Sequence, residues 1–439
     1  MRDRSLVYLS VYGPRMLADP KTIDILAMLS VLPDGFPDNE TVMEELESHL
    51  PEGYDHWKAL LTMWRVLLVQ VEEAGATHRL QLLSPVCAFC EQRLEASEEL
   101  KNSITSFYVE KMDCFMDIRD SDGHTIILGE LDNVYAVLVQ AWKQGRGSSM
   151  IANASIQFTD WSRYVGNPVE KVIGLAIQGV VGLPGLHGRC HLAIGEVYLQ
   201  QNKLDKAEAS FKCAVELHQQ AHDVFGEAND VGTLGVVYLQ QNRLDEAKAS
   251  FKCAAELCQQ VHSVFGEANN ARTLGEVYLR QDKLDKAETS FKHATKLYWQ
   301  VHDILGEANN LGNLGAVYLQ QDKLDEAEAL FKYAAKLHRQ IHFFFGVATD
   351  VGILEVVYLW QNKLDEPEAL SEQAAKLYQQ IHFVFGEVNN VGNLGEVYLQ
   401  QDKLDKAEAS FEYAAELHQQ AHDVLGEAND ILKLGEVYL

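Results

Sequence analysis

The chain has 439 residues, of which 47% are hydrophobic and 23% charged, the balance of a folded soluble protein. Its formal net charge of −27 at pH 7 argues against a nucleic-acid partner, because phosphate binding needs clustered Lys and Arg. No apolar run of about 18 residues could cross a membrane, and the N-terminus lacks a secretory cleavage site. We therefore expect a cytoplasmic protein.

Behind an N-terminal tail at 1–13, residues 14–98 are predicted to form a small winged-helix-like module. Its expected elements are helices at 21–32, 39–48 and 57–68, strands at 69–71 and 79–83, and a helix at 85–94. DNA binding is disfavoured, because the helix at 55–70 offers only Lys58 and Arg65 as cations.

Cys87 and Cys90 form a lone Cys-x-x-Cys, and no second pair stands at the spacing of a zinc site. We interpret the seven cysteines as reduced thiols and expect no metal. Residues 99–187 are predicted to form a helical connector, with helices at 130–144, 150–164 and 169–181.

Three short stretches of sequence in and next to this module resemble a known family. Gly13-Pro14-Arg15-Met16, then Leu-Ser-Val-Leu-Pro-Asp-Gly at 29–35 and Leu-Leu-Ser-Pro at 82–85, resembles the region that follows the nucleotide-binding domain in fungal NB-ARC/STAND-type receptors. Those proteins continue into helical repeats. The chain has no Gly-x-x-x-x-Gly-Lys-Ser/Thr, so we expect neither a nucleotide nor another cofactor.

From residue 188 onward the sequence repeats itself. Gly-Glu-Val-Tyr-Leu at 195–199 returns, intact or with changes, every 40 residues as far as 435–439. Six units are predicted to start near Gly188, Ala228, Ala268, Ala308, Ala348 and Val388, and a seventh is truncated at 439.

Each unit is predicted to contain two amphipathic helices. A short polar turn such as 202–205 joins them, and its Asn or Asp can take the left-handed conformation that ends a helix. Asp205 is expected to cap the second helix, and Gly-Glu-Ala-Asn to lead into each first helix.

Leu234, Gly235, Tyr238, Ala247, Phe251 and Ala254 resemble the tetratricopeptide (TPR) signature, and the 40-residue period is similar to that of Pins-like adaptors and fungal NLR-type receptors. The resemblance implies an all-α TPR-type solenoid over 188–439, a right-handed superhelix whose first helices line a concave groove. In the fifth unit Glu355, Pro367 and Ser371 replace the glycine, alanine and phenylalanine, so we expect this unit to be the weak point.

No catalytic set stands out from the repeat background, and we expect no enzyme activity. The His-x-x-x-His pairs 218/222, 338/342 and 418/422 have the spacing of metal ligands on one helical face. No third ligand accompanies them, and we interpret them as polar helix ends.

The groove is the candidate site. The resemblance places on it a set of residues from the first helices: Asn229, Asn269, Arg272, Glu276, Arg280, Asn309, Asn313, Trp360, Asn389, Asn393, Glu396 and Asn429. An Asn ladder can hold the backbone of an extended peptide, because each amide both donates and accepts. The framework barely changes between units while these positions vary, which suits partner recognition; the alternative is drift at exposed positions of duplicated units.

We therefore expect a protein–protein interaction scaffold whose groove binds a peptide or protein, as the recognition part of an NLR-like signalling protein. The alternative is a Pins-like adaptor without a receptor role. The seventh unit has no capping helix after it, so self-association through this end is also expected.

Overall fold

The computed structural model describes residues 20–37, 40–52, 54, 69–74, 77–82, 90, 94–115, 121–165, 170–361, 363, 367–380, 383–420 and 422–438. The chain divides into two compact units, residues Met1–Gly226 and Glu227–Leu439, and each is described by itself.

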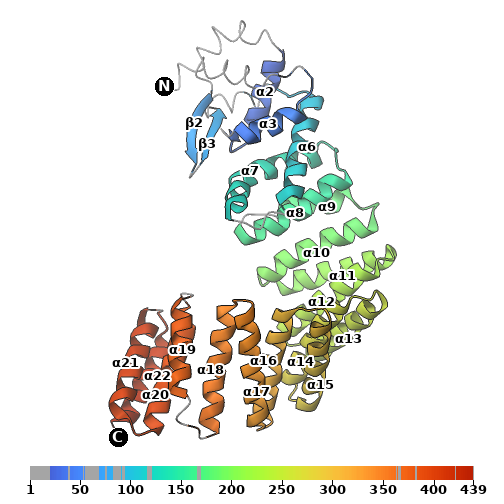
Figure 1. Cartoon of the computed structure of the whole chain (residues 1–439). Coiled ribbons are helices and arrows are strands. Elements are labelled where there is room, and N and C mark those ends of the chain that lie inside the picture. Colours follow the sequence, from blue (N-terminus) through green and yellow to red (C-terminus); the bar gives the residue numbers. More distant parts are fainter. Residues whose placement is uncertain are drawn as a thin grey trace. The chain divides into compact units, whose positions relative to one another are not determined.

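The first unit combines a small sheet with helices (Figure 1). Its elements are α2 (Pro20–Val31), β1 (Phe36–Pro37), α3 (Glu40–His49), β2 (Val69–Ala74), β3 (Thr77–Leu82), α6 (Glu98–Phe115), α7 (Ser121–Lys143), α8 (Ser149–Val165), α9 (Glu170–Gly179), α10 (Pro184–Gln200) and α11 (Leu204–Gln220). Strands β2 and β3 form an antiparallel hairpin, and β1 pairs with the other edge of β3.

The predicted helices at 21–32 and 39–48 and the hairpin are confirmed. The expected helix at 57–68 lies outside the described residues, as does most of the one at 85–94, and the winged-helix interpretation stays a prediction. The connector is helical as expected, but α7 begins at Ser121 rather than near residue 130. Asn133 of α7 fixes the loop after α2, because its amide donates to Gly35 O at 2.8 Å and accepts from Asp34 N at 3.0 Å.

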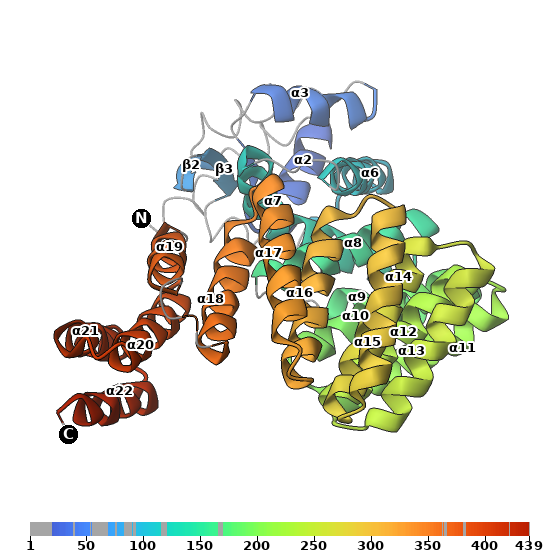
Figure 2. The ribbon, with the colours of Figure 1, turned by 60° about the horizontal axis from the view of Figure 1, so that its bottom comes forward.

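The second unit consists of helices packed in chain order (Figures 1 and 2). They are α12 (Val224–Gln240), whose first turn belongs to the first unit, α13 (Leu244–Gln260), α14 (Val264–Arg280), α15 (Leu284–Gln300), α16 (Ile304–Gln320), α17 (Leu324–Gln340), α18 (Phe344–Trp360), α19 (Pro367–Gln380), α20 (Val384–Gln400), α21 (Leu404–Gln420) and α22 (Val424–Val437). Each helix packs on the next, and the first helices α14, α16, α18 and α20 also contact one another in order. The all-α repeat solenoid is thus confirmed.

A left-handed residue ends the helices at 20-residue intervals. Asp282 has φ 57°, and the N–H of the following Lys283 donates to Tyr278 O at 2.9 Å, closing the turn. The same conformation recurs at Asn202, His222, Asn242, His262, His302, Asp322, His342, Asp402 and His422. Asn, Asp and His tolerate it better than other residues with a side chain.

This turn corrects one expectation about the His-x-x-x-His pairs, that their two imidazoles lie on one helical face. His338 is buried in the last turn of α17, whereas His342 lies beyond the helix with φ 56°. The two imidazoles therefore do not share a helical face, and the same holds for His418 and His422.

Two expected helix starts are also wrong. Asp205 does not cap α11, because the helix already begins at Leu204 and its N-cap is Lys203. Gly-Glu-Ala-Asn does not lead into the first helices but lies inside them. Helix α16, for example, begins at Ile304, where the side chain of Asp303 accepts the N–H of Gly306 at 3.0 Å.

The two helices of a unit are interlocked by a glycine and a phenylalanine. A Cβ added to Gly275 would lie 2.6 Å from the ring of Phe291, so only glycine allows this approach. Phe291 is completely buried, as is Phe331, which packs in the same way against Gly315.

The fifth unit replaces this interlock with a buried polar group. Glu355 stands at the glycine position and Ser371 at the phenylalanine position, exposed by 0% and 1%. Ser371 hydrogen-bonds the Glu355 carboxylate, whose Oε2 also accepts from Asn390 Nδ2 at 3.3 Å. Burial raises the pKa of Glu355 to about 8. The two exchanges compensate for each other in volume. That the fifth unit is the weak point of the array stays a prediction.

We predict that the double variant Glu355→Gly/Ser371→Phe restores the interlock. Ser371→Phe alone should destabilise by about 1–3 kcal/mol, because the ring meets the carboxylate, and Glu355→Gly alone should cost a similar amount because it leaves a cavity. The double variant should be at least as stable as the parent in urea unfolding of the full chain. If the change in the free energy of unfolding of the double variant equals the sum of the two single changes, this coupling is contradicted.

A second prediction concerns pH. The folded chain keeps a proton on Glu355 up to about pH 8, whereas the unfolded chain releases it near the ordinary pKa of 4.5. The free energy of unfolding should therefore fall as pH rises between these values. Glu355→Gln should flatten this part of the profile of thermal midpoints, and Glu416→Gln, which removes an exposed carboxylate, should not. An unchanged slope in the Glu355 variant would refute a buried, protonated carboxyl.

Candidate functional site

The predicted groove residues all lie on one face of the first helices. Each of the twelve is exposed or half-buried, while the neighbouring positions that face the second helices are buried. On α16, for instance, Asn309, Asn313 and Ala316 stay accessible, whereas Leu314 and Val317 are buried. The 3.6-residue period of the helix thus keeps these positions on a common surface.

Five of the twelve residues line one cavity of about 640 Å³. Asn269, Arg272 and Glu276 come from α14, and Asn309 and Asn313 from α16. Helix α18 supplies a third wall: Phe345, Thr349 and Ile353. The remaining seven predicted residues do not line this cavity: Asn229, Arg280, Trp360, Asn389, Asn393, Glu396 and Asn429.

Two asparagine side chains of the cavity accept hydrogen bonds from side chains of the second helices. The Tyr298 hydroxyl donates to Asn269 Oδ1 at 2.6 Å. His338 Nε2 lies 3.2 Å from Asn309 Oδ1 and donates to it, because a carbonyl oxygen can only accept. Within the described part of the chain neither amide nitrogen has a hydrogen-bond partner. Each asparagine therefore presents two N–H donors to the cavity.

The charged groups of the cavity are mostly paired. Arg272 forms an ion pair with Glu276 one turn further along α14. His338 Nδ1 lies 2.7 Å from Asp350 Oδ2. Burial raises the pKa of the Asp350 carboxyl, and this effect exceeds the lowering caused by the hydrogen bond to His338. Burial likewise raises the pKa of Tyr298, which remains a hydroxyl donor at neutral pH.

The sequence did not assign Tyr298 and His338 to the site, because each lies on a different helix from its asparagine partner. It also missed Leu305 and Phe345, which line the cavity at the start of α16 and α18. The signal for Leu305 was Asp303, an N-cap residue three positions before Gly306 that places the start of α16 one turn earlier, whereas the N-cap of α18 is Phe343, whose side chain makes no capping bond.

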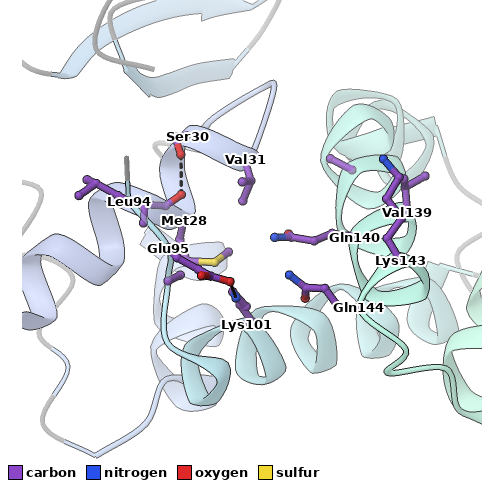
Figure 3. A pocket seen from close by; sticks show the side chains of 13 residues that line it. Met28, Ser30, Val31, Leu94, Glu95, Lys101, Val139, Gln140, Lys143 and Gln144 are labelled. Atoms are coloured by element: carbon purple, nitrogen blue, oxygen red, sulfur yellow. Dashed lines mark hydrogen bonds and ion pairs between the residues drawn. The ribbon is translucent and has the colours of Figure 1, made fainter. Parts of the chain in front are cut away.

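A second cavity, of about 630 Å³, lies in the first unit between α2, α6 and α7 (Figure 3). Met28 and Val31 form an apolar wall, and Gln140 and Lys143 face them across the opening. The buried Lys101 at its base donates to Glu95 at 3.0 Å and to Glu98 at 2.8 Å, so its charge is already neutralised. No sequence motif pointed to this cavity.

Nowhere in the described ranges do three or more His, Cys, Asp or Glu side chains gather closely enough to hold a metal ion. None of the described helices has the length and apolar character needed to cross a bilayer.

Comparison with known proteins agrees with this geometry. A tetratricopeptide repeat model matches residues 189–260, 227–300 and 267–340, and a second such model matches 390–420, so these stretches are tetratricopeptide repeats. No curated protein sequence matches the chain.

Two solved structures are similar in fold. A Signal Transduction ATPase with Numerous Domains (STAND) protein with a tetratricopeptide repeat sensor, from Pyrococcus horikoshii, matches 99% of this chain at 16% identity and a TM-score of 0.67. The chain spans 61% of the length of that structure. The apo form of RapI matches 77% of this chain, at 11% identity and a TM-score of 0.51. The match covers 97% of the RapI chain. At these identities the likeness concerns the fold alone.

Proposed function

We propose that the chain is a protein-interaction scaffold that binds an extended peptide in the cavity between α14, α16 and α18. The observation that carries this proposal is the orientation of Asn269 and Asn309. Their carbonyl oxygens are held by Tyr298 and His338, and their amide nitrogens have no partner among the described residues. Peptide main-chain carbonyls are acceptors at regular intervals and suit such a row of donors.

We further propose that this scaffold is the recognition part of an NLR-like signalling protein. The support is the resemblance of residues 14–98 together with the likeness over nearly the whole chain to a STAND protein that has a tetratricopeptide repeat sensor. A Pins-like adaptor role is the alternative. The gene sequence upstream of Met1 distinguishes the two, since an in-frame P-loop domain favours the receptor.

We also propose that the chain occupies a reducing, cytoplasmic compartment, because Cys190, Cys213, Cys253 and Cys258 carry free thiols.

Self-association is proposed for α22. Its Ile431 and Leu432 side chains are 56% and 69% exposed, whereas the equivalent Val391 of α20 is buried. Adjacent exposed apolar side chains on one helix favour contact with a second copy.

The peptide proposal predicts a sharp effect of removing the amide donors. Asn269→Ala/Asn309→Ala removes the N–H groups without adding charge to the cavity. Peptides selected on the full chain from a random displayed library should bind this variant about tenfold to a hundredfold more weakly, for two lost hydrogen bonds of about 1 kcal/mol each. The matched control Asn389→Ala/Asn429→Ala makes the same change outside the cavity. Equal affinity for both variants would defeat the proposal.

For self-association, light scattering of the full chain should give a mass that rises with concentration. Ile431→Ser/Leu432→Ser should keep it monomeric, whereas Val181→Ser, which removes a 65% exposed apolar side chain of the first unit, should change nothing. A parent chain that stays monomeric at all concentrations would end this idea.

A further inference from the structure

The first helices carry a regular row of exposed apolar residues. The second residue of α14, α16, α18 and α22 is large and apolar, and all four stay exposed: Phe265 by 53%, Leu305 by 40%, Phe345 by 42% and Leu425 by 82%. Because one such residue occurs per unit, the apolar row runs along the same direction as the asparagine ladder.

The two rows meet in the cavity. Leu305 and Phe345 line it together with Asn269 and Asn309. The ring of Phe345 packs edge-on against Phe383 at 5.2 Å between centroids, which holds it at the rim of the cavity. One edge of the site is therefore apolar, and amide donors lie beside it.

The apolar edge also carries a negative charge without a cation. Asp303 Oδ1 caps α16 by accepting the N–H of Gly306, and no Lys, Arg or His in the described part of the chain forms an ion pair with this carboxylate. The other charges of the cavity are engaged, Arg272 with Glu276 and Asp350 with His338. The site thus has an excess of negative charge, in a chain whose formal net charge is −27.

We infer that the partner is a cationic, apolar peptide in extended conformation. Its main-chain carbonyls accept from Asn269 and Asn309, its apolar side chains cover Leu305 and Phe345, and a Lys or Arg pairs with Asp303. This inference rests on the proposed function of the same groove and adds the chemistry of the partner. Its main warrant is charge complementarity at Asp303, next to an apolar surface that water otherwise contacts.

The test starts from a random displayed peptide library selected on the full chain, and the affinities of synthetic peptides from the enriched set are then measured by fluorescence anisotropy. We expect enriched peptides to combine at least one Lys or Arg with several apolar residues. Enrichment of acidic peptides, or of cationic peptides without apolar residues, would overturn the inference.

Two pairs of variants then separate the contributions. Leu305→Ser/Phe345→Ser should weaken binding about tenfold, the effect of losing about 1.4 kcal/mol of apolar contact. Trp299→Ser/Tyr333→Ser removes side chains that are as exposed, 65% and 44%, but lie on the second helices, and should have no effect.

The second pair tests the charge. Asp303→Asn keeps the cap and removes the charge, so affinity should fall about threefold to tenfold at low salt and lose much of its salt dependence. Asp423→Asn makes the same change at the cap of α22 and should be neutral.

The outcomes distinguish this inference from the function on which it rests. If binding depends on the two asparagines but is unchanged in Leu305→Ser/Phe345→Ser or Asp303→Asn, the groove binds peptides and the inferred chemistry is wrong. If no selected peptide depends on the asparagines, the proposed function itself fails.

Discussion

The left-handed residue that ends the helices is the constraint on which the rest of the second unit depends. It fixes 17-residue helices joined by three-residue turns, as in α14, α15 and α16, and so reverses the chain at equal intervals. Because the first helices from α12 to α20 then have the same length of 17 residues and start at 40-residue intervals, equivalent residues recur in line. The asparagine ladder and the apolar row are both products of this regularity. A turn of different length would rotate the next helix and break both rows.

At the junctions between units, a side chain in the last turn of one helix precedes a polar side chain of the next helix. From one junction to another these two residues change together, as matched pairs. His338 of α17 faces Asp350, and His418 of α21 faces Asp430 at 2.6 Å, so a carboxyl group stands beside each imidazole. After Tyr298 the equivalent position is Asn310 instead, which donates to Phe291 O at 2.7 Å. An aspartate could not make that bond. Glu355 with Ser371 follows the same principle within a unit, where one exchange is tolerated because of the other.

The sequence predicted the period, the two helices per unit and the exposed face correctly, because a sustained 3.6-residue pattern is insensitive to where a helix begins. It placed the first helices one turn too late, because Gly-Glu-Ala-Asn was expected to lead into them rather than to lie inside them, and so Leu305 and Phe345 were not assigned to the site. The bond from Tyr298 to Asn269 had no sequence signal, because it joins residues of different helices. The His-x-x-x-His pairs were not assigned as metal ligands, but their two imidazoles were wrongly placed on one helical face, because the second histidine is the left-handed residue of the turn.

The matched pairs limit how the array can change by recombination. Copies of equal length allow unequal crossing-over to delete or insert whole units without disturbing the glycine–phenylalanine interlock, which lies within a unit. The junctions between units tolerate the deletion or insertion of a unit less well, because their paired polar residues come from two different units. Removing one unit between Tyr298 and Asp350 would leave an aspartate beside Phe291 O and Thr295 Oγ1, both of which now accept from the Asn310 amide. Removing two units would bring Tyr298 before Asn390 and keep an amide donor there. Gain and loss of repeats should therefore favour even numbers in this part of the gene.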